Sequence, residues 1–143
     1  MDLESKLRPV AEALLGPGED LRGFCIATQV GLFTGRQVVL AITDGRLIAQ
    51  GMNRKFEPVG DPISLPPERI AKASAEGAGG GWMTIGSAIM DGAAVTLKVR
   101  TTDGEKLKLS MMRGTGMLGK LGGGETQRQG LEAMAAWFAQ HAR

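Results

Sequence analysis

The chain has 143 residues, of which 43% are hydrophobic and 22% are charged, and its formal net charge is +2. This length and composition are typical of one globular domain, which we place at residues 1–143. The net charge is too small to argue for general nucleic-acid binding, and we expect no nucleic-acid partner. The single cysteine, Cys25, excludes a disulfide framework or a thiolate metal site, and its apolar neighbours predict a buried core thiol.

The N-terminal residues lack a basic start followed by a long apolar run, and no stretch approaches the roughly 20 apolar residues that span a bilayer. We therefore expect a soluble cytoplasmic protein. Apolar residues at helical spacing predict a first helix over about residues 7–15, with its regular part starting near Pro9 and ending before Gly16 and Pro17. The residues at this spacing are Leu7, Val10, Ala11, Leu14 and Leu15.

Short apolar runs bounded by turn residues predict strands over about residues 20–112. These runs occupy 21–29, 37–43, 46–52, 62–65 and 68–76, with 84–90 as a further candidate. No helix-length segment separates them, which favours an antiparallel barrel or sandwich over a parallel sheet.

The segment from Val95 to Ser110 has the two-residue period of a half-buried hairpin. Pairing its apolar residues places Val99 opposite Leu107 and leaves a three-residue loop, 102–104, in which Gly104 takes the left-handed position. The polar residues then face water together, with Arg100 opposite Lys106 and Lys98 opposite Lys108.

The last segment, about 126–141, predicts one helix with Thr126 and Gln129 spaced as a capping box. Its expected inward face carries Leu131, Met134, Ala135 and Phe138.

Three stretches, "LLGPGEDL", "LAITDGRLIAQ" and "PISLPPERIAKAS", occur in an order that resembles the bacterial pleckstrin-homology-like domains related to the GRAM and YokE-type groups. The resemblance covers nearly the whole chain. It implies a strongly bent seven-stranded antiparallel barrel or sandwich with a C-terminal helix closing one end, and Trp137 matches the aromatic residue that many members place in this helix.

The resemblance transfers function less directly. Eukaryotic pleckstrin-homology domains hold phosphoinositides with basic residues on the first two strands and their loop, where this chain offers only Arg22 and Arg36. Bacterial relatives look like adaptor or self-assembly modules. The resemblance therefore implies a protein-interaction or self-assembly module with an unknown partner.

Basic residues gather in one part of the chain. Residues 94–120 contain six cations against Asp103 and Glu105. These candidates for an anion or lipid surface are Lys98, Arg100, Lys106, Lys108, Arg113 and Lys120. Weak docking on an anionic membrane is therefore the alternative function, and a merely solvated outer face is the simpler interpretation.

Gly-rich stretches raise two further alternatives. The loop Gly114–Lys120 matches the start of a phosphate-binding P-loop, but Leu121 replaces the required Ser or Thr, which makes nucleotide binding the weakest hypothesis. Apolar residues in these stretches could pack on the core, contact a protein or enter a membrane interface. The interaction-surface candidates are Trp82, Met117, Leu118 and Leu121.

Catalytic groups are scarce. The only histidine, His141, lies three residues from the C-terminal end, and the adjacent Glu19 and Asp20 are typical of a solvated turn. The ligand count is too low for a metal site. We therefore expect a non-enzymatic domain with no catalytic residue, cofactor or metal.

Overall fold

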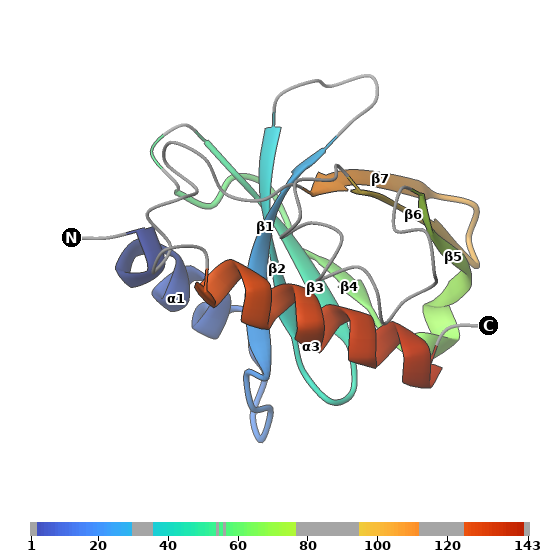
Figure 1. Cartoon of the computed structure of the whole chain (residues 1–143), viewed down its shortest axis with the longest axis horizontal. Coiled ribbons are helices and arrows are strands. Elements are labelled where there is room, and N and C mark those ends of the chain that lie inside the picture. The colour runs from blue at the N-terminus through green and yellow to red at the C-terminus, as the bar shows by residue number, and fades with distance from the viewer. Residues whose placement is uncertain are drawn as a thin grey trace.

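The computed structural model describes residues 3–29, 36–53, 55, 57–76, 95–111 and 125–141. Within these residues two helices flank seven strands, as the sequence predicts, and the candidate strand at 84–90 lies outside them (Figure 1). The elements are α1 (Leu3–Ala13), β1 (Gly23–Gln29), β2 (Arg36–Ile42), β3 (Leu47–Met52), β4 (Ile63–Leu65), the 3-10 turn η1 (Pro67–Arg69), β5 (Ile70–Glu76), β6 (Val95–Thr101), β7 (Lys106–Met111) and α3 (Glu125–His141).

The strands form one antiparallel sheet in the order β4-β3-β2-β1-β7-β6-β5. Among the described residues, β1 pairs with β7 at two positions, Thr28 with Ser110 and Gln29 with Leu109, and the sheet bends sharply between β1–β4 and β5–β7 (Figure 1). The described strands do not close into a barrel, because β4 and β5 remain its two edges. Of the barrel and the sandwich expected from the sequence, the described strands therefore form the bent sandwich.

Helix α3 covers the inner side of this bend. All four residues predicted for its inward face are buried, and they pack on alternate residues of the strands, including Cys25 and Leu97. Cys25 is fully buried, as expected. The helix begins at Glu125, and the side chain of Thr126, for which a cap was predicted, lies outside the described side chains.

Helix α1 covers the opposite face of β1–β3, where Leu7 and Ala11 pack against residues such as Phe24 and Ile26. The prediction that the helix starts near Pro9 was wrong, because α1 begins at Leu3 and contains Pro9. Proline removes one backbone hydrogen bond from the helix, but burial of the apolar stripe on the sheet outweighs that loss. The helix also ends at Ala13, earlier than predicted.

The hairpin of β6 and β7 has the predicted register. Val99 pairs with Leu107 and Arg100 with Lys106. The backbone N–H of Thr101 donates to the Glu105 carbonyl oxygen at 2.8 Å, which closes the three-residue loop. Gly104 has a φ of 92°, the left-handed conformation that this loop requires.

Candidate functional site: a basic face on β5–β7

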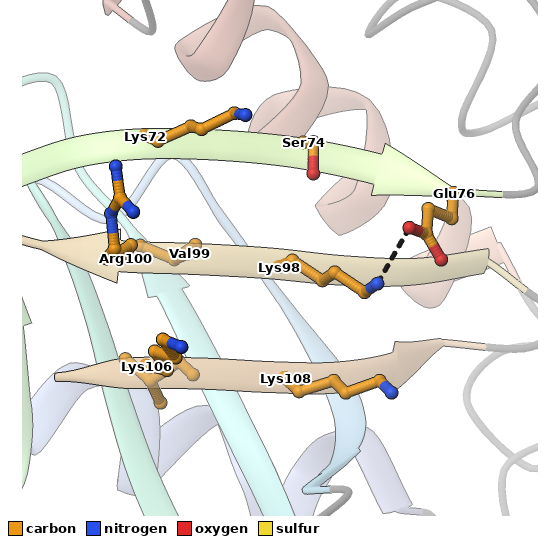
Figure 2. Close-up of a pocket in the computed structure, with 9 residues that line it drawn as sticks. Lys72, Ser74, Glu76, Lys98, Val99, Arg100, Lys106 and Lys108 are labelled. Carbon is orange, nitrogen blue, oxygen red and sulfur yellow. Dashed lines mark hydrogen bonds and ion pairs between the residues drawn. The ribbon is translucent and has the colours of Figure 1, made fainter.

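The four strand cations predicted from the hairpin share one outer face. Lys98 and Arg100 alternate along β6 with the buried Val99, and Lys106 and Lys108 alternate along β7 with Leu107. Because successive side chains of a strand point to opposite sides, burial of the valine and leucine side chains directs all four cations outward. Figure 2 shows them side by side on the two strands.

A fifth cation, Lys72, joins this face from β5 and was missed by the sequence analysis. Pairing of β5 with β6 places Lys72 beside Arg100, which itself pairs with Lys106 (Figure 2). The signal was present, because residues 72, 74 and 76 are polar and alternate with alanines in a segment already predicted as a strand. What the local pattern could not give was the strand that β5 pairs with.

Strand pairing arranges the outer side chains in three cross-strand rows, and we call the first two rows the basic face. The first row contains Lys72, Arg100 and Lys106, and the second contains Ser74, Lys98 and Lys108. The third row contains Glu76, Thr96 and Ser110. Charge is therefore concentrated at one end of the three strands, with hydroxyl groups and one carboxylate at the other.

The basic face is compact compared with the range of electrostatic screening. Neighbouring strands are about 4.8 Å apart and alternate residues about 6.7 Å apart, so the five Cα atoms span about 10 Å by 7 Å. The Debye length at physiological ionic strength is about 8 Å. The five positive charges therefore act on one another and on an approaching anion as a group.

Acidic side chains compensate only part of this charge. Lys98 Nζ lies 2.7 Å from Glu76 Oε1, and this bond, together with the nearby positive charges, lowers the pKa of Glu76. Arg69 faces the two acids of the hairpin turn, with nitrogen–oxygen distances of 3.5 Å to Asp103 and 3.7 Å to Glu105. The turn acids therefore have a cation of their own that is not part of the basic face.

The other four cations of the basic face form no ion pair with any residue in the described part of the chain. All four are exposed. Between them and their neighbours on the three strands lies an open depression of about 500 Å³. A broad, open surface of this kind suits a large anionic partner better than an enclosed small molecule.

Several predicted residues lie outside the described residues. Among them is the Gly114–Lys120 loop, considered for nucleotide binding. The others are Arg113, Lys120, Trp82, Met117, Leu118 and Leu121. The candidate site is therefore built from the strand cations alone.

Of the two adjacent acids expected in a solvated turn, Asp20 is exposed, whereas Glu19 is half-buried and has fixed partners. Arg46 holds Glu19 with nitrogen–oxygen distances of 2.6 and 2.8 Å, and the backbone N–H of Gly16 donates to the same carboxylate at 2.6 Å.

Within the described ranges, no three His, Cys, Asp or Glu side chains are placed to hold a metal ion. None of the described helices has the length and apolar character needed to cross a membrane.

No family model and no curated protein matches the chain in sequence. Two of the solved structures that resemble it are as follows. The C-terminal domain of an unknown protein from Leishmania infantum has 15% identity and a TM-score of 0.48 over 96% of this chain and 92% of its own length. The hSac2 domain from the human phosphoinositide phosphatase Sac2 has 15% identity and a TM-score of 0.50 over 96% of this chain and 81% of its own. At this identity the likeness concerns the fold alone.

Proposed function

We propose that this chain is a non-enzymatic binding domain that docks on membranes containing anionic phospholipid, through the basic face of β5–β7. The observation that carries the proposal is the gathering of five cations from three strands, with Glu76 as the one described carboxylate in the neighbouring row of these strands. We further propose that the domain belongs to the pleckstrin-homology-like group. The strand order with a C-terminal helix supports that assignment.

The chemistry of the basic face favours a membrane over a small anion. Four of its five cations are lysines, which are flexible point charges without the planar fork that arginine offers to a single phosphate. The depression on this face is open to solvent, so it would not enclose a small anion. Many phosphate groups in a plane would satisfy such a surface without fixed geometry.

The expected affinity of one domain for an anionic membrane is modest. Each cation near an anionic membrane contributes about 1 kcal/mol. Five cations and one carboxylate give a net charge of +4, which corresponds to about 4 kcal/mol and a dissociation constant of about 1 mM. One copy of the domain would therefore bind weakly and reversibly.

Co-sedimentation with vesicles tests this proposal. Wild-type protein should bind vesicles containing phosphatidylserine, lose binding as salt rises, and ignore vesicles of phosphatidylcholine alone. The variant Lys106→Gln/Lys108→Gln should bind about 30-fold more weakly, because it loses two of these contributions.

A matched control removes the same charge elsewhere. Lys6 in α1 and Lys55 before β4 are exposed and lie outside the basic face. The variant Lys6→Gln/Lys55→Gln should therefore bind almost as well as wild type. Equal losses in the two variants would mean that only net charge matters, and no binding to either vesicle would overturn the proposal.

A further inference from the structure

The two edges of the sheet differ in a way that points to a partner. β4 has three residues and is flanked by Pro62 and Pro66, which limits further pairing. β5, at the other edge, has seven residues, and no described strand pairs with its outer side. An edge of this length can accept another strand through its backbone N–H and C=O groups.

We propose that β5 pairs with β5 of a second copy of this chain, as an antiparallel ladder with its two-fold axis at Ser74. When two identical antiparallel strands pair around a two-fold axis at one residue, a position before that residue lies opposite the position equally far after it in the other copy. With the axis at Ser74, Lys72 of each copy therefore lies opposite Glu76 of the other.

Charge favours this register over the one centred on Ala73. An axis at Ala73 would place Lys72 opposite Ser74 and Glu76 opposite Ile70, so neither charge would meet its opposite. Opposite charges directly across an antiparallel pair are favourable, and the Ser74 register forms two such pairs for each dimer.

The local structure of β5 suits the same register. The irregularity in its pairing with β6 falls between Ile70 and Lys72, so the five residues from 72 to 76 are a regular strand. Ala73 and Ala75 carry small side chains that do not obstruct a neighbouring strand. Glu76 is already paired with Lys98 of β6 at 2.7 Å, so in the dimer its carboxylate would be shared between Lys98 and Lys72 of the other copy.

This dimer would join the two basic faces. Residues directly opposite in an antiparallel pair point to the same side of a sheet, so the three outer strands of each copy would form one six-stranded surface. Its net charge would be twice that of a single basic face. If the proposed membrane docking holds, a linked dimer should bind anionic vesicles roughly 100-fold more tightly than a monomer.

A cysteine at the axis tests the ladder directly and without lipid. Directly opposite Cα atoms in an antiparallel pair lie about 4.5–5.5 Å apart, within the range that a disulfide spans. Ser74→Cys should therefore form a disulfide-linked dimer in oxidised glutathione. Ala71→Cys is the control, because in this register the two copies of residue 71 lie about 20 Å apart and should not cross-link. Native Cys25 is fully buried and should not contribute.

Charge variants test the register independently of the added thiol. Lys72→Glu would place two acids opposite one another and should shift sedimentation equilibrium toward monomer at least 10-fold, whereas Lys72→Glu/Glu76→Lys should restore the dimer. A wild-type monomer at all concentrations, or cross-linking of Ala71→Cys as fast as of Ser74→Cys, would overturn the proposal. Failure of vesicle binding with an intact Ser74→Cys dimer would instead overturn the membrane function alone.

Discussion

A Cβ atom on Gly130 of α3 would overlap the backbone carbonyl oxygen of Phe24 in β1. A second close approach between β1 and α3 lies one residue earlier in the strand, where a Cβ on Gly23 would lie 3.0 Å from the Cβ of Ala133. The helix backbone therefore lies directly against the backbone of β1. This close approach fixes the distance of α3 from the bend of the sheet.

We expect Gly130→Ala to lower the free energy of unfolding by about 2 kcal/mol, since α3 must move outward and its buried face must repack. The better helix propensity of alanine offsets only about 1 kcal/mol of the steric cost. Urea unfolding followed by tryptophan fluorescence measures the change.

Gly45, in the turn between β2 and β3, is the control for this substitution. A Cβ there would meet no atom within 4 Å. Gly45→Ala should therefore change the free energy of unfolding by less than about 0.5 kcal/mol. Similar losses in both variants would show that contact with Phe24 is not the cause.

The elements of this fold that sequence patterns predict are those with strong local alternation. Val95, Leu97 and Val99 alternate with polar residues, and matching them to the apolar residues of β7 was enough to give the hairpin register. The start of α1 was not predictable in this way. Its length depends on burial of Leu7 and Ala11 on the sheet, a tertiary contact that outweighs the local effect of Pro9.

The same distinction between local patterns and long-range contacts applies to the candidate site. Lys98, Arg100, Lys106 and Lys108 were identified from the hairpin alone, because the two strands are adjacent in sequence. Lys72 was missed, since its strand pairs with β6 across the intervening residues 77–94. No local periodicity specifies such a long-range pairing, and the irregularity after Ile70 further shifts its register.

The ion pair of Glu19 with Arg46 should make stability depend on pH. The bonds from Arg46 and from the Gly16 N–H lower the pKa of Glu19 from 4.5 to about 2. A lowered carboxyl pKa stabilises the folded state fully above pH 4.5, and this contribution disappears as pH falls toward 2. Glu19→Gln should therefore cost about 2 kcal/mol at pH 7 and progressively less below pH 4.5.

Urea unfolding at pH 7, 4 and 3 checks this dependence. Asp44→Asn is the control, because Asp44 also pairs with an arginine, Arg22, but its side chain is 75% exposed. Solvent screens such a pair, so Asp44→Asn should have a much smaller effect. A loss for Glu19→Gln that is the same at every pH would contradict the assigned role of its charge.

The thiol of Cys25 should be unreactive in the folded protein. Burial raises its pKa to about 12, so almost no thiolate forms near neutral pH, and the side chain is inaccessible to reagents. We expect no reaction with a disulfide reagent at pH 8 until the chain is unfolded in urea. The Ser74→Cys variant provides an exposed thiol for comparison, and equal rates for the two cysteines would contradict the burial of Cys25.

Two neutralising substitutions on β5 should change membrane affinity in opposite directions. Lys72→Gln removes one cation of the basic face and should weaken binding to phosphatidylserine vesicles about fivefold. Glu76→Gln removes the carboxylate that pairs with Lys98, so it should strengthen binding by a similar factor. Both effects should shrink as salt is raised, because screening shortens the range of every charge on the face. Co-sedimentation at protein concentrations where the chain is monomeric separates these effects from pairing between copies. Weaker binding by both variants would mean that β5 acts through its shape or its edge, and not through the charge of the basic face.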